Sequence, residues 1–344
     1  KIIPVDGYGT QEMIRSVIRN EKPDILWMMT DPRFYEWLWQ IENEIRPLCP
    51  IVYYHVWDNF PAPHFNAKFY NSNDLVVSIS KLTHDIVKEV APDVPCKYIP
   101  HAVREDVFKP ITEDERKILR ENALGPDKDK FVAFWNNRNA RRKQSGTLLF
   151  WWKDWLDKEN LHDKAQLIMH TEPKDPHGQD LGHIVEQLGL DSDRQVLFST
   201  QKIPLEQMGA LYNMSDVTIN ISDAEGFGLA TLESLSCGTP IIANMTGGLQ
   251  EQVLGNGVAI FPSSKSVIGS QQVPYIYEDR ISKESFLAAL DKMYFLGEEG
   301  RRNLGKQGYR HTRQNYSFEE FEKQWVETML QVREEHGSWP TKNY

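Results

Sequence analysis

The sequence is poor in cysteine, in long apolar runs and in positive charge. Its 344 residues include only three cysteines, whose wide spacing excludes a disulfide scaffold and a zinc site. No apolar stretch approaches the roughly 18–20 residues of a membrane-spanning helix, and the first residues lack the pattern of a signal peptide. We therefore expect a soluble chain of a reduced, cytoplasmic compartment.

The charge balance narrows the possible partners. Lys+Arg 39 against Asp+Glu 49 gives a net charge of −10. Because nucleic acids are bound by basic surfaces, this balance argues against a nucleic-acid partner. It also weakens general attraction to anionic membranes, although peripheral membrane contact stays open. Hydrophobic residues make up 40% of the chain, enough for sizeable cores, and the length predicts two domains.

Short apolar segments alternate with helical periodicity along the whole chain, which predicts parallel α/β domains. In the first third we expect strands at residues 1–5, 24–29, 51–56, 75–80 and 96–100. A second series is expected at residues 131–135, 166–171, 195–199, 217–221, 239–244 and 258–261. Residues 147–158 predict a helix with one apolar face, which we expect in a core rather than on a membrane; that face carries Leu148, Leu149, Trp152, Trp155 and Leu156.

This order predicts two Rossmann-like domains facing across a cleft. We place the N-terminal domain at residues 1–110, with a C-terminal helix at about 318–344 packing back on it. The C-terminal domain then spans residues 111–317. Ligands of such sheets bind at the carboxyl ends of the strands.

The most informative segment is 215–253. Its expected strand runs into Gly226-Phe227-Gly228, which opens a helix, and glycines at a helix N-terminus let backbone N–H groups approach an anion. Glu225 stands just before this helix and Glu233 within its second turn. Since a carboxylate can accept two hydrogen bonds from a vicinal diol, the pattern fits a ligand with phosphates in the middle and hydroxyls on both sides. A nucleotide-sugar has that form.

Within this segment EGFGLATLESLSCGTPIIA resembles the signature of the retaining GT-B glycosyltransferases of family 4. Residues 98–108 (YIPHAVREDVF) are similar to the stretch that ends the family's N-terminal domain, departing at His101, Ala102 and Arg104. Residues 136–144 (NNRNARRKQ) resemble the family's basic element. The resemblance covers nearly the whole chain. It implies a hexosyltransferase of EC 2.4 type that uses a UDP- or GDP-sugar, retains configuration by a front-face route and needs neither cofactor nor metal.

The resemblance also implies residue roles. The catalytic set would be Glu225, His55, Arg138 and Lys143, and the donor-binding set Glu233, Gly226, Phe227, Gly228, Leu229, Arg142 and Ser199. Arg138 and Lys143 would contact the diphosphate, with Arg141 and Arg142 as weaker candidates. Glu225 would hold the sugar hydroxyls and Glu233 the ribose. The loop after Ser199 would contact the base, and His55 would lie near the transferred sugar.

Each of these residues also has an ordinary structural interpretation. The two glutamates could be a helix-terminal acid and an exposed helix residue. The basic segment could be a solvated loop, and His55 a buried core group. For His101 and His170, which also follow expected strands, we favour structural roles. Asp191-Ser192-Asp193 mimics the metal-binding D-x-D of another glycosyltransferase fold, but we expect an ordinary turn there.

The N-terminal domain has fewer expected strands than the family's acceptor domain. We expect its first strand or two, with a glycine-rich loop, to lie upstream of Lys1 or to be missing. A second hypothesis is therefore a non-catalytic sugar-nucleotide-binding or scaffold protein with a degenerate acceptor domain. A GT-B-like epimerase or phosphorylase is a further alternative. The base, the sugar, the acceptor and the oligomeric state stay open.

Overall fold

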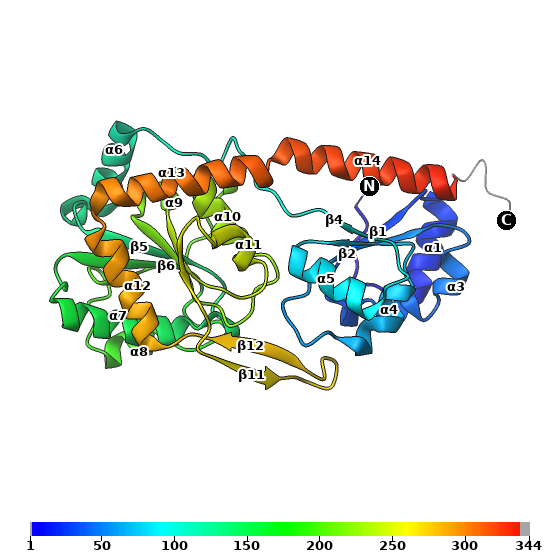
Figure 1. Cartoon of the computed structure of the whole chain (residues 1–344), viewed down its shortest axis with the longest axis horizontal. Coiled ribbons are helices and arrows are strands. Elements are labelled where there is room, and N and C mark those ends of the chain that lie inside the picture. Colours follow the sequence, from blue (N-terminus) through cyan, green and yellow to red (C-terminus); the bar gives the residue numbers. More distant parts are fainter. Residues whose placement is uncertain (1, 338–344) are drawn as a thin grey trace. The chain divides into compact units, whose positions relative to one another are not determined.

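The computed structural model describes residues 2–337, which form two compact α/β units (Figure 1). Unit 1 comprises residues 2–101, 267–277 and 319–337, and unit 2 comprises residues 102–266 and 278–318. The expected boundary at residue 110 is thus too late, and residues 267–277 belong to unit 1 rather than to the C-terminal domain. Within the described residues, no helix is long and apolar enough to cross a membrane.

Unit 2 contains a six-stranded parallel sheet in the order β10-β9-β8-β5-β6-β7. Its strands are β5 (Phe131–Asn136), β6 (Ala165–His170), β7 (Val196–Ser199), β8 (Val217–Asn220), β9 (Ile241–Asn244) and β10 (Val258–Ile260). All six coincide with expected strands. The order is that of a dinucleotide-binding sheet, in which successive strands are added first to one side of β5 and then to the other.

Helices cover both faces of this sheet, because right-handed crossovers change face when the direction of strand addition reverses. The buried side chains of one face come from α7 (Ser145–Glu159), α8 (Leu181–Gln187) and α12 (Lys283–Phe295). The other helices of the unit are α6 (Glu113–Leu124), α9 (Leu205–Met214), α10 (Leu229–Ser236), α11 (Leu249–Val253) and α13 (Gly297–Asn315). Short 3-10 turns occur at Gly125–Asp127 and Arg141–Lys143.

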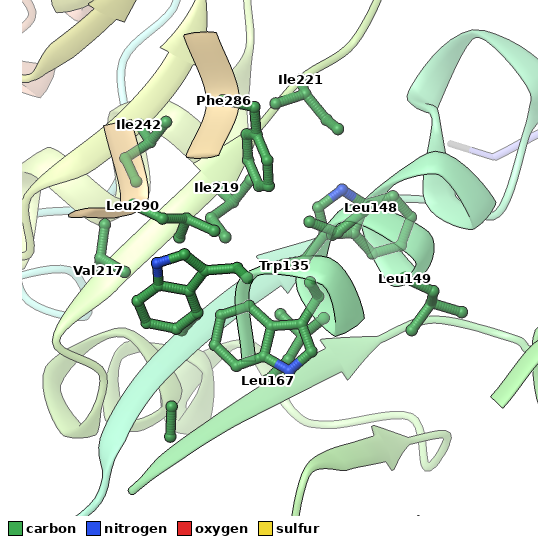
Figure 2. Close-up of a cluster of buried hydrophobic side chains, with 14 of the residues drawn as sticks. Trp135, Leu148, Leu149, Leu167, Val217, Ile219, Ile221, Ile242, Phe286 and Leu290 are labelled. Atoms are coloured by element: carbon green, nitrogen blue, oxygen red, sulfur yellow. The ribbon is translucent and has the colours of Figure 1, made fainter. Parts of the chain in front are cut away.

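The core of unit 2 lies between the sheet and helices α7, α8 and α12 (Figure 2). The expected apolar face of α7 is confirmed, since Leu148, Leu149, Trp152, Trp155 and Leu156 are fully buried. Each such side chain stabilises the fold by about 1.5–3 kcal/mol through removal of apolar surface from water. Core packing therefore accounts for the aromatic richness of this helix, and a membrane-binding role is unnecessary.

Unit 1 contains a four-stranded parallel sheet in the consecutive order β1-β2-β3-β4. Its strands are β1 (Leu26–Thr30), β2 (Ile51–His55), β3 (Leu75–Ser78) and β4 (Cys96–Tyr98). Its helices include α1 (Gln11–Glu21), α2 (Glu36–Trp39), α3 (Glu42–Ile45), α4 (Ala67–Asn71) and α5 (Lys81–Val90), with 3-10 turns at Pro32–Phe34 and His64–Asn66. The strand expected at residues 1–5 is wrong over residues 2–5, which have no regular secondary structure.

The last helix, α14 (Phe318–His336), packs on the unit 1 sheet through one aromatic contact cluster. The Trp325 ring lies 4.9 Å from Tyr54 and 5.8 Å from Trp27, both edge-on. Lys97 also donates to Thr328 at 2.7 Å. The part of the expected C-terminal helix beyond residue 337 lies outside the described residues.

A two-stranded sheet that the sequence pattern did not predict is formed by β11 (Ser264–Ile268) and β12 (Ile276–Arg280). Its tip is part of unit 1, where Val273 and Ile276 pack into the apolar cluster. There the Tyr277 amide donates to the Phe60 carbonyl at 2.7 Å. This packing explains why residues 267–277 belong to unit 1 and not to the C-terminal domain in which we expected them.

Candidate functional site

The reversal of strand order in unit 2 fixes the position of the site. β5 and β8 are neighbours in the sheet, but the helices that follow them, α7 and α10, belong to opposite faces. Their connecting loops must therefore separate at the carboxyl edge, which leaves a crevice where such sheets bind ligands. The loop after β5 carries the basic residues 138–143, and the loop after β8 carries Glu225.

Glu225 and Lys143 meet in a buried ion pair. The Lys143 ammonium contacts Oε2 of Glu225, and the two side chains are only 10% and 13% exposed. Burial alone would raise the pKa of Glu225, but the charges of Lys143 and Arg142 outweigh it and hold that pKa below its usual value. Arg142 also donates to the Ala224 carbonyl. The structure thus joins the two loops through residues that the motif had marked separately.

The start of α10 is shaped by glycine. Gly228 has φ +90, and a Cβ there would lie 2.4 Å from a Leu249 methyl carbon, so a larger residue is excluded. α10 has no side-chain cap hydrogen bond at this end, and its first amides have no acceptor within the helix. Leu229 is exposed, whereas the Phe227 side chain is buried against Tyr316. Phe227 can therefore face a ligand only through its backbone.

Glu233, one turn further along α10, is partly exposed and lies beside Tyr212. The Tyr212 hydroxyl donates to Oε2 of Glu233 at 2.5 Å, and Asn136 Nδ2 donates to the same hydroxyl at 2.8 Å. Desolvation raises the pKa of Glu233 to about 7, and the Tyr212 hydrogen bond opposes this rise. A partly exposed carboxylate with so few donors is well suited to accept hydrogen bonds from hydroxyls of a ligand.

Arg138 lies apart from the buried pair. It is 59% exposed, and its guanidinium donates from Nε and Nη2 to Asp175 at 2.6 Å and 3.1 Å and from Nη2 to His177 at 2.7 Å. The hydrogen bond from Arg138 holds the pKa of Asp175 well below its usual range. Because this fork is exposed and geometrically suited to oxyanions, it could exchange the carboxylate for a phosphate.

Ser199 ends β7 at the same carboxyl edge of the unit 2 sheet. Its hydroxyl lies 2.9 Å from Nδ1 of His170, the last residue of β6. The pair links the ends of two strands, which is the structural role expected of His170. The expected base-contacting loop begins directly after Ser199.

His55 belongs to unit 1, and its catalytic role stays a prediction. Its side chain is fully buried, and its two ring nitrogens lie 3.0 Å and 2.7 Å from the hydroxyls of Tyr53 and Tyr70. Burial lowers its pKa to about 3. A neutral imidazole enclosed by two hydroxyls is a satisfied core group, the ordinary alternative for a histidine on a buried strand.

Sequence reasoning missed two sets of residues around the site. One is Asn136 and Tyr212: Asn136 opens the basic segment but was given no role there, and Tyr212 lies outside every motif, because their partners are distant in sequence. The other is the pair of buried acids Glu278 and Asp279 on β12. Glu278 accepts the Arg141 guanidinium on both carboxylate oxygens, and Asp279 accepts from Thr246 at 2.8 Å. Their only sequence signal is two adjacent acids after an aromatic run.

The turn expected at Asp191-Ser192-Asp193 is confirmed. Oδ1 of Asp191 accepts the backbone N–H groups of Asp193 and Arg194 at 2.9 Å and 3.0 Å. The first acid of the motif is therefore used to close the turn. Among residues 2–337, no group of three or more His, Cys, Asp and Glu side chains is arranged to hold a metal ion.

Sequence comparison places unit 2 among known proteins. The family model for Glycosyl transferases group 1 matches residues 119–311. A D-inositol 3-phosphate glycosyltransferase of Corynebacterium jeikeium is 28% identical over 189 residues, 54% of this chain and 44% of the relative. A GDP-mannose-dependent alpha-(1-6)-phosphatidylinositol monomannoside mannosyltransferase of Mycolicibacterium smegmatis is 27% identical over 192 residues, covering 54% and 47%. The chain spans about half the length of the curated relatives it matches.

Structural comparison extends the similarity to both units. A sucrose-phosphate synthase from Thermosynechococcus elongatus matches with a TM-score of 0.73 at 18% identity, over 93% of this chain and 76% of that protein. HepE of Anabaena, solved in complex with UDP and glucose, matches with a TM-score of 0.69 at 16% identity, over 94% and 84%. These similarities show a GT-B fold. Together with the family model, they establish that the chain belongs to the glycosyl transferases group 1.

Proposed function

We propose that this chain is a retaining hexosyltransferase that moves a sugar from a UDP- or GDP-sugar to an acceptor hydroxyl. One observation carries the proposal: the buried Lys143–Glu225 pair and the partly exposed Glu233 flank the start of α10 at the strand-order reversal. This arrangement offers positive charge and free helix amides between two carboxylates that can hold hydroxyls. A nucleotide-sugar presents the complementary order of sugar diol, diphosphate and ribose diol.

The proposed donor complex uses the residues in the roles that the motif implies. Glu225 holds the sugar hydroxyls, and the backbone at Gly226–Gly228 with Leu229 surrounds the sugar and the diphosphate. Glu233 accepts the ribose hydroxyls, and the loop after Ser199 contacts the base. Lys143, Arg142 and Arg138 compensate the charge that develops on the leaving diphosphate. Because these groups and the helix N-terminus supply positive charge, we propose a reaction that requires no metal ion or other cofactor.

Retention is proposed to follow a front-face route. A double displacement needs a carboxylate nucleophile close to the anomeric carbon. Glu225 is the motif carboxylate nearest that position, but the Lys143 ammonium contacts its Oε2 and thereby lowers the nucleophilicity of the carboxylate. The leaving diphosphate is therefore the more plausible base for the incoming hydroxyl. Mass-spectrometric trapping of a covalent glycosyl–Glu225 adduct would exclude this route.

Two similarities support the class of donor without identifying it. The mycobacterial relative is named for GDP-mannose, and HepE was solved with UDP and glucose. All three cysteines are among the described residues and form no disulfide, which is consistent with the reduced, cytoplasmic compartment that we propose. The proposal does not specify the acceptor, which in this fold faces the N-terminal domain. A glycan, a lipid-linked sugar and a small molecule are all compatible with it.

A non-catalytic sugar-nucleotide-binding protein is the second candidate. It is favoured by unit 1, whose described sheet has four strands and whose expected catalytic histidine is enclosed in the core. Both candidates bind the donor, so binding does not separate them.

The experiment combines donor screening with turnover. Thermal shift with UDP, GDP, ADP and their sugars identifies the nucleotide, because a ligand at about 100-fold excess over Kd stabilises the protein by about 2.7 kcal/mol. Release of free nucleotide from the identified donor, with a panel of acceptors, then supports transfer. Binding without release from any acceptor supports the second candidate. The Glu233→Ala variant should lose the thermal shift, and an unchanged shift would remove Glu233 from the site.

A further inference from the structure

Glu233 has an incomplete set of hydrogen-bond donors. Glu233 is partly exposed on α10, and among the described residues the Tyr212 hydroxyl is the donor found for its carboxylate, at Oε2. A carboxylate has about four lone-pair sites, so most of its accepting capacity is unused by these residues. The unused lone pairs are therefore available to hydroxyl donors of a ligand bound at this edge of the sheet.

Tyr212 is held rigidly in the orientation that Glu233 requires. Its side chain is fully buried, its ring lies edge-on to Phe134 at 5.1 Å and to Phe108 at 6.1 Å, and its hydroxyl accepts from Asn136 Nδ2. Because Asn136 donates to the hydroxyl oxygen, the hydroxyl hydrogen is left to point at Glu233. Asn136 is the last residue of β5, which places this chain of hydrogen bonds at the same carboxyl edge as the basic loop.

We propose that Asn136 and Tyr212 are positioning residues for the donor: they hold one oxygen of Glu233 so that its remaining lone pairs face the two ribose hydroxyls of the bound nucleotide. The inference rests on the proposed function, since Glu233 must be the ribose ligand. It goes further because it assigns to Tyr212 a role in distinguishing a ribose from a deoxyribose. Neither residue touches the reacting atoms.

The same geometry makes donor binding sensitive to pH. Charge-assisted hydrogen bonds from the diol require the ionised carboxylate, and burial raises the pKa of Glu233 to about 7 while Tyr212 lowers it. The groups that couple to Glu233 are Tyr212 from α9 and Cys237 from its own helix. The other elements packed on α10, namely α11, α13, β8 and β9, contribute no charged group to this balance among the described residues. Nucleotide affinity is therefore expected to rise as pH increases toward 7 and to level off above it.

The test is calorimetric titration of UDP and GDP, each beside its 2′-deoxy form, from pH 5.5 to 8.5. Wild type should bind one ribonucleotide and discriminate against its deoxy form, with affinity falling up to tenfold per pH unit below about 7. Tyr212→Phe keeps the ring but removes the hydroxyl that donates to Glu233. Because that hydrogen bond lowers the pKa of Glu233, the variant's curve of nucleotide affinity against pH should move to higher pH by about one unit. At pH 7 it should bind about tenfold more weakly, recover at pH 8.5, and discriminate less against the deoxy form.

Three further variants serve as controls for the effect of Tyr212→Phe on nucleotide binding. Tyr294→Phe removes a hydroxyl from a tyrosine beside Trp155 and Phe131 and should leave the whole profile unchanged. Asn136→Ala should move the curve in the same direction as Tyr212→Phe and serves if that variant does not fold. Glu233→Gln should bind weakly with no pH dependence in this range.

Two results would overturn the assignment of Tyr212. One is an unshifted profile with unchanged ribose discrimination in Tyr212→Phe and Asn136→Ala. The other is an equal loss of affinity at every pH, which indicates a merely structural role. Failure of the proposed function gives a different result, because wild type then binds none of these nucleotides or does not distinguish ribose from deoxyribose.

Discussion

The two units build parallel sheets from similar apolar strands, but they add those strands in different orders. In unit 1 the order is consecutive, β1-β2-β3-β4, so the crossovers among the described strands leave in one direction. In unit 2 the direction reverses at β5, and neighbouring loops separate at the boundary with β8. Only the second arrangement opens a crevice at the carboxyl edge, and the motif residues of unit 2 gather there.

The difference also appears in the hydrogen-bond partners of one titratable side chain in each unit. His55 ends β2 in unit 1, is fully buried and has hydroxyl partners at both ring nitrogens. Glu233 in unit 2 is partly exposed and has one described hydroxyl donor, Tyr212. Complete satisfaction is typical of a structural group, whereas an incomplete donor set is typical of a group that binds a ligand. Burial and hydrogen-bond partners together therefore distinguish a core residue from a binding residue.

The largest expected effect comes from breaking the buried pair of unit 2. Lys143→Ala removes the ion-pair partner of the buried Glu225 carboxylate and leaves only the nearby charge of Arg142, which should lower the free energy of unfolding by about 3–5 kcal/mol. It should also reduce nucleotide release by at least about 10²-fold, through loss of charge stabilisation at the leaving diphosphate. Denaturant unfolding and turnover measure the two effects. The double variant Lys143→Met/Glu225→Gln should recover stability but not turnover, and recovery of turnover would remove the pair from the site.

The second prediction concerns unit 1. His55→Ala removes one hydrogen-bond partner from each of the buried hydroxyls of Tyr53 and Tyr70 and leaves a cavity, which should cost about 2–4 kcal/mol of stability. Nucleotide affinity, measured by calorimetry well below the melting temperature, should be unchanged. Intact stability with lost turnover would instead support the catalytic role expected for His55.

A smaller effect is expected at the exposed edge of the site. Arg138→Ala should weaken nucleotide binding by about tenfold, because one bidentate phosphate contact is lost. Stability should change by less than about 0.5 kcal/mol, since the Arg138 side chain is 59% exposed. Calorimetry and denaturant unfolding test both parts. Arg194→Ala, which removes another exposed arginine at 54% exposure, is the matched control and should leave binding unchanged.

The smallest expected effect is a difference between the two units in how their local stability changes as the pH is lowered. The pKa of His55 falls from 6.5 to about 3 on folding, so its contribution to stability is present above pH 6.5 and declines as pH falls below that value. The pKa of Glu233 rises from 4.5 to about 7, so folding binds an extra proton between these values and stability declines as pH rises through them. Acidification from pH 7 to 5.5 should therefore weaken unit 1 and strengthen the α10 region.

Hydrogen exchange with mass spectrometry measures this difference. After correction for the intrinsic pH dependence of exchange, peptides covering β2 should lose protection at pH 5.5 and peptides covering α10 should gain it. His55→Ala should abolish the first change and Glu233→Gln the second. Equal changes in both peptides would show that the two titrations do not dominate local stability.

Much of the fold was predictable because local patterns agreed with the final packing. The six strands of the unit 2 sheet were apparent as short apolar runs that alternate with helical patterns, and the apolar face of α7 followed from helical spacing. Where local pattern and packing diverged, prediction failed. Residues 2–5 are apolar enough for a strand but have no partner strand among the described residues. The β11–β12 sheet has a tip whose packing in unit 1 no local pattern could indicate.

The candidate site divides in the same way. Glu225, Gly228 and Glu233 were visible because one turn and one helix hold them at fixed spacing. Lys143 was visible as a basic residue but not as the partner of Glu225, which lies 82 positions away. Nothing in the sequence indicated the roles of Tyr212 and Asn136, because a hydrogen-bond chain from β5 through α9 to α10 exists only after the sheet has formed.

The sequence by itself determined the fold class, the strands of unit 2 and the segment that carries the two glutamates, because these depend on periodicity and on short spacings along the chain. The tertiary structure alone decided that His55 is enclosed, that Lys143 neutralises Glu225, and that Glu233 stays short of donors beside Tyr212. Those outcomes depend on burial and on contacts between distant segments. Burial and distant contacts determine whether a polar side chain is satisfied within the fold or kept for a ligand.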